Sequence, residues 1–367
     1  MDDIVFVTAD SVRYDAVVEM DHISSREVLD GRAAAQYTRP SLASIHGSSY
    51  ESVLTGRVER PTLASVLGDA GYATLGLSPN PNTNGVFGFD EGFDRYDSFL
   101  EPGNRGSSLR QYLANFDLLR RVYYKFYPPH AKSENRPSDR EVVEKGIKWF
   151  NAAEPPRFLW IHLMETHRPY GSGDDAVSEE LDQKAFFKPE KLTDAEEREI
   201  DAKYRNALER ADRNIRHLLE SVDSDPAFVF TADHGEGFGD EGYYFHQPQL
   251  RRVDDCLVKV PVVFDDFDVD GPLSLLDLAP TIAASAGAEV PEAWHGNDLT
   301  ETDTEYTITI APWHDQATVL WQDFERRLES RDADVTFESA ETDGATEVED
   351  DVPEDIQDQL HDLGYVN

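Results

Sequence analysis

The sequence of 367 residues has a single cysteine, Cys256, and no run of about 18 consecutive apolar residues. One cysteine excludes an internal disulfide framework. Without a long apolar run, no transmembrane helix is predicted. Residues 1–8 place two acidic residues directly before an apolar stretch, so we expect no signal peptide and a soluble, cytoplasmic protein without stable membrane insertion.

Basic residues are also scarce, because 34 lysines and arginines face 73 aspartates and glutamates and the formal net charge is -39. Such self-repulsion opposes compact folding in dilute buffer, but in molar salt the Debye length falls to about 3 Å. We therefore expect a protein from a salt-adapted organism. The alternative, a nucleic-acid mimic or an acidic partner-binding protein, would concentrate its acidic residues in a block, whereas here they are spread along the chain. The missing basic face excludes nucleic-acid binding.

The apolar content is sufficient for a packed interior, with 39% hydrophobic and 11% aromatic residues. The chain is longer than one hydrophobic core usually organises, so we expect one large domain with a smaller appendage. The sequence does not indicate the oligomeric state.

Short apolar runs alternate with amphipathic segments over the first 270 or so residues, the order typical of strands and helices in an α/β domain. The predicted strands are residues 4–8, 72–78, 158–164, 227–233 and 260–266, and the predicted helices are residues 61–71 and 193–220. This order predicts a mostly parallel sheet sandwiched by helices.

The pattern changes near residue 301, where alternating segments at 306–313, 317–330 and 333–339 predict a small antiparallel sheet. We divide the chain into an α/β domain (1–300), an antiparallel subdomain (301–340), an acidic linker (341–355) and a C-terminal helix (356–367). Residues 101–135 interrupt the α/β alternation and are either a lid over the active-site mouth or an ordinary surface insertion.

Polar residues follow several predicted strands, at the edge where an open α/β sheet binds its ligands. Asp10 follows the first strand, Asp233 ends the fourth, and residues 162–167 bring histidines to the end of the third. A helix cap explains any single aspartate better than a site does. Three coinciding cases favour a site.

The segment "TADHGEGFGDEGYYFH" combines Asp233 and His234, with His246 twelve residues beyond His234. Gly235 supplies the backbone freedom that both side chains need to face one crevice. Oxygen and nitrogen donors suit Mn²⁺, Zn²⁺ or Mg²⁺. Asp-His-Gly alone is a weak signal, but together with Asp10 and a hydroxyl at Thr38 it predicts a metal site.

These motifs together resemble the sulfatase-like branch of the alkaline phosphatase superfamily, and the resemblance runs nearly end to end. The matching segments, in chain order, are "DDIVFVTADSVRYD", "TRPSLAS", "PTLASVLGDAGYATLGLSPNP", "GFDEGFDRYD", "HLMETHRPY", "TADHGEGFGDEG", "LLDLAPTIAASAGAEVP" and "LHDLGYV". Their order is specific, although no single one is decisive. The resemblance implies an alkaline phosphatase/sulfatase-like fold with the catalytic site in residues 1–300.

The resemblance further implies that Asp10, Asp233 and His234 bind one divalent metal ion, which would be Mn²⁺, Mg²⁺, Zn²⁺ or Ca²⁺. Thr38, in the position of the family's nucleophile, would bind the same ion through its oxygen and attack the substrate. A hydroxyl is a poor nucleophile until a metal lowers its pKa, after which the alkoxide can attack phosphorus in line.

The remaining site residues are also implied by the resemblance. His167 and His246 would contact the transferred group or the leaving oxygen. Arg39 and Arg168 would neutralise the substrate anion, since so acidic a protein needs a local positive field to admit one. An ion pair with one of the many acidic residues is the alternative for each arginine.

Departures from the family pattern narrow the chemistry. Typical sulfatases carry a cysteine that is oxidised to formylglycine at the position of Thr38, and Cys256 lies far from it, so we expect no formylglycine. Ser11 replaces the second aspartate of the usual pair, and Leu42 replaces the arginine that follows Pro-Ser. A set of Asp, Thr, Asp and His around one metal ion resembles phosphodiesterase, phosphatase and phosphoglycerol-transferase members more than formylglycine enzymes.

A second metal site remains open, with His246 and either Glu165 or His167 as partial ligands; the expected further Asp-x-x-x-His pair is absent from the sequence. We expect one tightly held metal ion, and a structural role for His162 inside its strand. The insertion 101–135 and the loop around Asn80 and Asn82 are expected to determine specificity.

The predicted function is hydrolysis of a phosphate mono- or diester, with a small anionic ester or a sugar or lipid phosphate as substrate. Three alternatives stay open: a sulfuric ester hydrolase, a phosphoryl-group transferase, and a non-catalytic binding protein of the same fold. Retention of Asp10, Thr38, Asp233 and His234 argues against the last, and the lack of a membrane span argues against the transferase.

Overall fold

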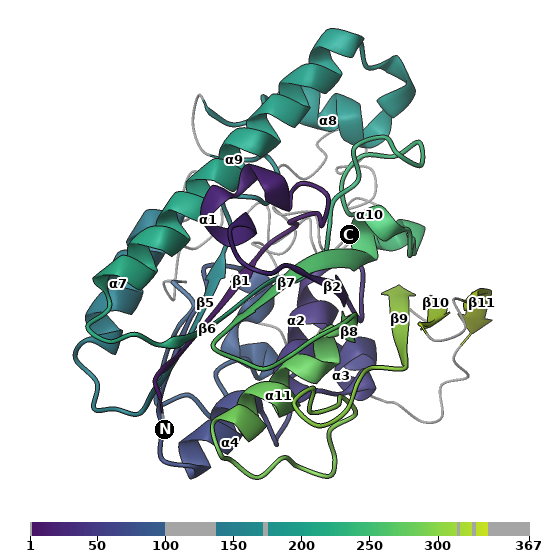
Figure 1. Ribbon diagram of the computed structural model, residues 1–367. Helices are drawn as coiled ribbons and strands as arrows, with labels where there is room; N and C mark the ends of the chain where they lie inside the picture. The colour runs from purple at the N-terminus through teal and green to yellow at the C-terminus, as the bar shows by residue number, and fades with distance from the viewer. Residues whose placement is uncertain (1, 100–136, 172–174, 314–315, 325–327, 337–367) are drawn as a thin grey trace, which may run out of the picture.

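The computed structural model describes residues 2–99, 137–171, 175–313, 316–324 and 328–336 (Figure 1). The predicted insertion (101–135), the acidic linker (341–355) and the C-terminal helix (356–367) lie outside these residues. Within these ranges, no helix is both long enough and apolar enough to cross a membrane.

The core of the fold is an eight-stranded sheet with the order β4-β3-β5-β1-β6-β7-β2-β8. Its strands are β1 (Ile4–Ala9), β2 (Leu29–Arg32), β3 (Ala73–Leu77), β4 (Arg95–Asp97), β5 (Arg157–Leu163), β6 (Ala227–Ala232), β7 (Lys259–Asp265) and β8 (Leu273–Ser274). The strands from β4 to β6 all run parallel. The predicted mostly parallel sheet is confirmed.

Strand β7 is the exception, because it pairs antiparallel with both β6 and β2. A parallel return needs a crossover of a dozen or more residues, usually a helix. Between β6 and β7 the only helices are a 3-10 turn (Pro248–Leu250) and α10 (Asp255–Val258), neither long enough to cross the sheet. The chain therefore comes back in the opposite direction.

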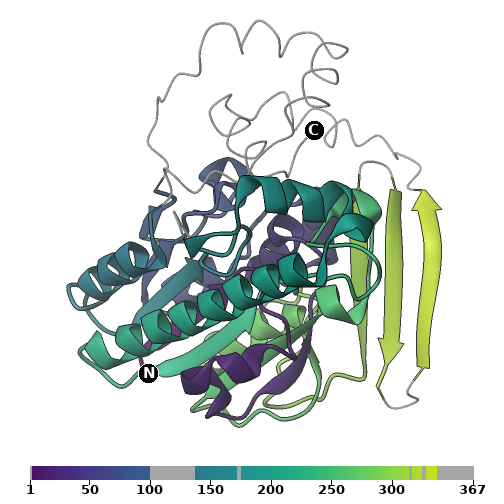
Figure 2. The same cartoon turned by 90° about the horizontal axis from the view of Figure 1, so that it is seen from above.

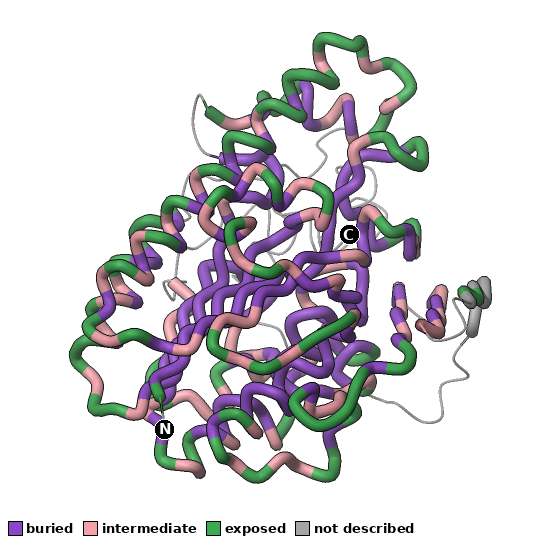
Figure 3. The backbone as a smooth tube through the Cα atoms, in the orientation of Figure 1, coloured by how far each residue is buried: buried purple, intermediate pink, exposed green. Residues whose placement is uncertain are grey.

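Helices cover both faces of the sheet, which explains why its central strands are continuous apolar runs. The helices are α1 (Asp21–Ser24), α2 (Thr38–Gly47), α3 (Tyr50–Thr55), α4 (Leu63–Asp69), α7 (Asp139–Phe150), α8 (Glu179–Phe187), α9 (Asp194–Ser221) and α11 (Leu278–Ser285). Helices α1, α7 and α9 lie on one face, and α2, α4 and α11 lie on the other (Figures 1 and 2). Every residue of β1 and β5 is buried (Figure 3).

Helix α9 confirms the prediction for residues 193–220. Thr193 caps it, since its hydroxyl accepts from the Glu196 backbone N–H while the Glu196 side chain returns to the Thr193 N–H. The apolar residues spaced three and four apart face inward. All six predicted inner residues are buried: Ile200, Tyr204, Leu208, Ala211, Ile215 and Leu218.

The second sheet consists of β9 (Tyr306–Trp313), β10 (Gln316–Asp323) and β11 (Leu328–Thr336), all antiparallel. The prediction of one continuous segment over 317–330 is wrong, because Asp323 pairs with Leu328 and the chain reverses between them. No glycine or proline marks this reversal in the sequence, so the alternating pattern continued through it. The small sheet docks on the main domain, where Ile310 N–H donates to the Ala34 carbonyl.

His46 on α2 makes the fold sensitive to acid. Its ring is buried with its centroid 4.2 Å from that of Trp160, and burial, with a smaller effect of His162, lowers its pKa to about 3. Below about pH 6.5 the His46 ring binds a proton in the unfolded chain but stays neutral in the folded protein. Its contribution to the free energy of unfolding is therefore present above that pH and is lost as the pH falls. At pH 5 the loss is about 2 kcal/mol.

We therefore expect His46→Leu to reduce the drop in unfolding free energy between pH 7 and pH 5 by about 2 kcal/mol, measured by urea unfolding at fixed salt. The same substitution at the exposed His295 serves as the control. An identical drop in the His46 variant and the wild type would show that this ring does not carry the acid sensitivity.

Candidate active site and metal centre

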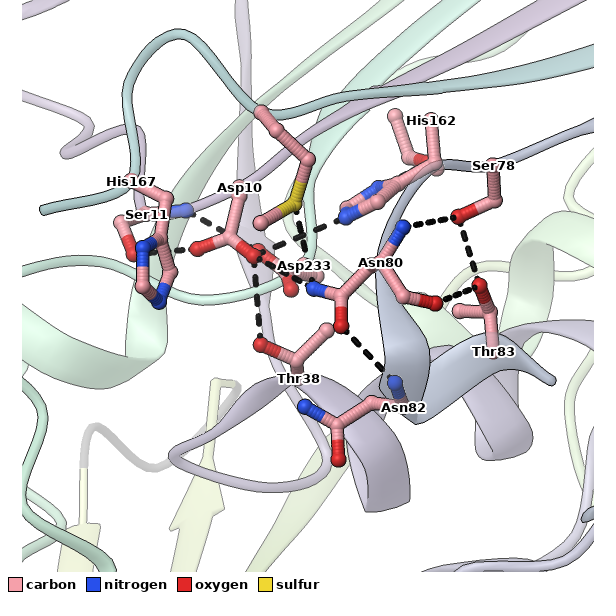
Figure 4. A network of polar contacts seen from close by, with 12 residues as sticks. Asp10, Ser11, Thr38, Ser78, Asn80, Asn82, Thr83, His162, His167 and Asp233 are labelled. Carbon is pink, nitrogen blue, oxygen red and sulfur yellow. Dashed lines mark hydrogen bonds and ion pairs between the residues drawn. The ribbon is translucent and has the colours of Figure 1, made fainter. Parts of the chain in front are cut away.

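The candidate site lies where β1, β5 and β6 end together. Ala9 pairs with Leu163 on one side and with Ala232 on the other, so the three strands reach the same edge of the sheet. Asp10 and Asp233 are the next residues after β1 and β6, and Thr38 opens α2 beside them (Figure 4). Asp10 and Asp233 therefore lie at the ends of strands, as the sequence predicts.

The Thr38 hydroxyl does not cap its own helix. Tyr37 is the N-cap residue, with extended backbone and no side-chain capping bond. Thr38 Oγ1 instead lies 3.3 Å from Asp10 Oδ2 and 3.2 Å from His234 Nε2, and the residue is fully buried. Its place in the first turn of α2 also exposes it to the positive end of the helix dipole, which favours a developing negative charge.

His234 presents an unprotonated nitrogen to this hydroxyl. Its Nδ1 lies 2.8 Å from the Gly235 carbonyl, which can only accept, so Nδ1 carries the hydrogen. Burial, together with the neighbouring His246, lowers the pKa of His234 to about 3, so the ring is neutral and Nε2 holds a lone pair. This tautomer, with the other ring nitrogen donated to a backbone carbonyl, is the usual one for a metal-binding histidine.

Asp233 is held by backbone donors and keeps one oxygen unsatisfied. Its Oδ1 accepts from Ser11 N–H at 3.0 Å and from His234 N–H at 2.9 Å. Its Oδ2 is buried without a hydrogen-bond partner in the described part of the chain, 3.5 Å from His234 Nε2. An orphaned buried carboxylate oxygen beside a histidine lone pair suits a cation.

The two aspartates oppose each other electrostatically. Burial and the charge of Asp10 hold the pKa of Asp233 well above its ordinary value. Burial opposes the ionisation of Asp10 too, but His167, His162 and His234 lower its pKa well below the ordinary value. A bound divalent cation would stabilise the ionised forms of both buried carboxylates together.

Two groups of side chains bring ligand atoms within 4.8 Å of one another: Asp10, His162 and Asp233, and Asp10, His167 and His246. Predicted ligands Asp10 and Asp233 share the first group, so their donors fit a divalent metal. His162 was expected to be structural, and its Nδ1 does contact Thr8 Oγ1 at 2.9 Å. Its Nε2 nevertheless faces Asp10 Oδ2 at 3.6 Å, so it also belongs to the edge of the site.

His167 and His246 come from distant segments and meet over the same edge, with ring centroids 5.3 Å apart. The His246 ring is also 4.4 Å from that of His234. Glu165, the other partner weighed for a second metal ion, forms an ion pair with Arg210 instead. The geometry thus favours His167 over Glu165 at that position.

The arginines take different places. Arg168 is buried and bound to both oxygens of Asp182, with its Nε 3.0 Å from Oδ1, which is the ion pair that the sequence left open as the alternative. Arg39 is half-buried beside Thr38 with its guanidinium 4.6 Å above the Phe87 ring. No ion pair of Arg39 is found among the described residues. Substrate binding by either arginine remains a prediction.

Sequence reasoning left Asn80 out of its site residues, although it noted the loop. Its Nδ2 donates to Asp10 Oδ2 at 3.2 Å (Figure 4). Ser11, noted only as a departure from the family, donates its hydroxyl to Asp10 Oδ1 at 2.6 Å. Asn80 lies just beyond the carboxyl end of β3, so the strand-end rule could have identified it.

Solved structures with the same fold include a phosphonate monoester hydrolase from Silicibacter pomeroyi, with TM-score 0.61 and 17% identity over 91% of this chain and 87% of that one. A 2-O GAG sulfatase matches with TM-score 0.59 and 16% identity over 90% and 85%. The C-terminal periplasmic domain of EcEptC from Escherichia coli, in complex with Zn, matches with TM-score 0.58 and 17% identity over 83% and 88%.

At such identities the structural matches establish the fold alone. No curated protein sequence matches the chain. The sulfatase family model matches residues 3–288, which include the strand ends, Thr38 and the histidines described above. The chain therefore belongs to the sulfatase family.

Proposed function

We propose that this protein is a metal-dependent hydrolase that cleaves a phosphate mono- or diester with Thr38 as the nucleophile. One observation carries the proposal: a buried hydroxyl lies within 3.3 Å of both a carboxylate oxygen of Asp10 and the lone pair of His234 Nε2. The Thr38 hydroxyl is not the cap of its helix, whose N-cap residue is Tyr37. The arrangement brings together the oxygen and nitrogen donors that a hard or borderline cation selects.

Asp10, Asp233 and His234 would hold one divalent ion, Mn²⁺, Mg²⁺, Zn²⁺ or Ca²⁺, together with the oxygen of Thr38. When bound, such an ion lowers the pKa of a hydroxyl and neutralises charge on a phosphoryl group. Asn80 supports this arrangement by holding Asp10 in place through its amide. A second metal ion near His167 and His246 would extend this proposal.

The protein's own residues account for the remaining requirements. The first turn of α2 places the Thr38 oxygen at the positive end of the helix dipole, which favours negative charge on that oxygen. His167 and His246 each bring a ring nitrogen within 4.8 Å of a carboxylate oxygen of Asp10 and can donate to phosphoryl oxygens or protonate the leaving oxygen. Arg39 lies next to the nucleophile in sequence and can offset the charge of the substrate. Water then releases the phosphoryl group from Thr38.

Threonine at position 38, together with the place of Cys256 in α10 rather than in α2, supports a reaction without formylglycine. The fold shared with a phosphonate monoester hydrolase supports a phosphorus substrate. A sulfate ester is the alternative substrate, since a 2-O GAG sulfatase also shares the fold. We further propose that residues 1–300 form the catalytic domain and 301–340 an attached subdomain, and that the acidic surface suits a salt-rich cytoplasm.

Turnover of nitrophenyl esters tests the function directly. In molar KCl we expect metal-dependent release of nitrophenol from nitrophenyl phosphate or bis-nitrophenyl phosphate, and loss of this activity when the metal is chelated. Release from the phosphate esters should be at least about tenfold faster than from nitrophenyl sulfate, which corresponds to a difference in transition-state binding of about 1.4 kcal/mol. Faster sulfate release would assign a sulfatase. Metal binding without turnover of any ester would assign a binding protein.

A further inference from the structure

We propose that Glu236 is a positioning residue that fixes the orientation and tautomer of His246 for the reaction. This inference rests on the proposed function, in which His246 contacts the reacting group. Glu236 is the fourth residue of the Asp-His-Gly-Glu segment, and its side chain is completely buried behind the site. A buried carboxylate needs a specific reason to be there, because leaving it without partners is strongly unfavourable.

The two oxygens of Glu236 have different partners. Oε1 lies 3.1 Å from His246 Nδ1, and Oε2 accepts from the Tyr170 hydroxyl at 3.0 Å. Tyr170 lies in the turn that also carries His167, since its N–H donates to the His167 carbonyl at 2.9 Å. One carboxylate therefore links the segments of both histidines that the proposed reaction uses.

The backbone returns His246 to Glu236 through a short hairpin. Gly239 N–H donates to the Tyr243 carbonyl and Phe245 N–H donates to the Gly237 carbonyl at 2.7 Å. Gly237 permits this close return, because a Cβ there would lie 2.7 Å from the Tyr243 ring and 3.1 Å from the Phe245 carbonyl oxygen. The hairpin thus fixes the distance between Glu236 and His246 before any substrate binds.

The hydrogen bonds around His246 determine its tautomer. Ser11 gives its hydroxyl hydrogen to Asp10 Oδ1 at 2.6 Å, so towards His246 Nδ1, at 3.3 Å, its oxygen acts as an acceptor. The Glu236 carboxylate is an acceptor as well. Both neighbours of Nδ1 thus require a hydrogen on it, so Nε2 is the ring nitrogen that exchanges a proton with the reacting group.

Arg168 lies in the same turn as His167 and Tyr170, with its guanidinium 4.5 Å above the ring of Phe245. Burial opposes its charge, but Asp182 first, and then Tyr170 and Glu236, raise the pKa of Arg168. The charge of Glu236 thus favours the cationic form of Arg168, whose ion pair is with Asp182.

Kinetics of four variants test the proposal: Glu236→Ala, Glu236→Gln, His246→Ala and the double variant Glu236→Ala/His246→Ala. We expect Glu236→Ala to lower kcat about 10- to 100-fold with little change in KM, as removal of such supporting partners does. Glutamine can present its carbonyl to His246 Nδ1–H and its amide to Tyr170, so Glu236→Gln should recover most of kcat. In the His246→Ala background, Glu236→Ala should change kcat less than threefold or so, because it acts through the ring.

A matched control is Asp212→Ala, which removes a buried carboxylate that accepts from the His22 and Ile23 N–H groups at the start of α1. It should lower thermal stability without lowering kcat. If Glu236→Ala leaves kcat unchanged, or if its effect multiplies with that of His246→Ala, the proposal is wrong.

A spectroscopic measurement separates this inference from the proposed function. In protein labelled with ¹⁵N-histidine, NMR should show His246 with hydrogen on Nδ1 in the wild type and in Glu236→Gln, and a mixture of tautomers in Glu236→Ala. This expectation holds even if no ester is turned over. A wild-type His246 with hydrogen on Nε2 alone would overturn the positioning role, whatever the activity.

Discussion

Replacing Thr38 with alanine is expected to lower turnover of a phosphate ester by about a thousandfold or more, because removal of a nucleophile leaves only binding and charge stabilisation. The fold should persist, since the change removes a hydroxyl and one methyl group from a site where Asp10 and His234 are held by other bonds. Thr38→Ser keeps the hydroxyl and should retain measurable activity. The measurement is kcat/KM with saturating metal, together with thermal unfolding of each variant.

Thr55→Ala is the matched control, because Thr55 is exposed on α3 and its hydroxyl makes only local bonds, donating to the Glu51 carbonyl and accepting from the Arg57 N–H. It should leave turnover unchanged. A phosphorylated peptide containing Thr38, trapped by acid during turnover and identified by mass spectrometry, would show the covalent intermediate directly. Activity of Thr38→Ala within a factor of about ten of the wild type would remove Thr38 as nucleophile.

Asp233→Asn is expected to weaken metal binding by more than about a hundredfold, which exceeds the usual effect of a residue that only supports a ligand. The same change should stabilise the metal-free protein near pH 7. Burial and the charge of Asp10 raise the pKa of Asp233, so its stabilising contribution is present below the unfolded pKa of about 3.9 and is lost as the pH rises through the folded pKa. An amide has no such charge to bury.

Metal affinity is measured by calorimetry, and stability by thermal unfolding with and without the ion. A ligand at a hundred times its Kd stabilises the folded state by about 2.7 kcal/mol, so the order of wild type and variant should reverse when metal is added. Asp265→Asn, at the end of β7 and paired with Arg26, is the control. If wild type and Asp233→Asn bind metal equally, the proposed metal centre lies elsewhere.

Local patterns predicted the parts of the site that depend on neighbours in sequence. Asp10 and Asp233 each follow a buried strand, and alternation of strands and helices is enough to bring such ends to one edge. The amphipathic stripe of α9 and its capping residues are equally local. The roles of Thr38 and the histidines came from a family resemblance, because no period or propensity distinguishes a reactive hydroxyl from a turn residue.

Long-range pairing explains what the sequence did not show. The partner of Arg168 is Asp182, fourteen positions away, and nothing in either segment marks it among so many carboxylates. Glu236 is one acidic residue in a glycine-rich loop until a hairpin brings His246 back to it. The direction of β7 goes with a connection that contains no helix long enough to cross the sheet. Such features depend on three-dimensional contacts that a single sequence does not specify.

The central position of β1 has a consequence for biosynthesis. This strand leaves the ribosome before its two neighbours in the sheet, β5 and β6, which follow much later in the chain. The contact of Ser11 with Asp233 joins residues 222 positions apart. A nascent chain that lacks β6 also lacks Asp233 and His234, so loading of the proposed metal ion would follow the completion of the sheet and would not nucleate it. Recombinant production should therefore supply the metal ion after translation. Because β1 is unpaired until β5 and β6 have been made, the availability of chaperones that protect it should limit the yield.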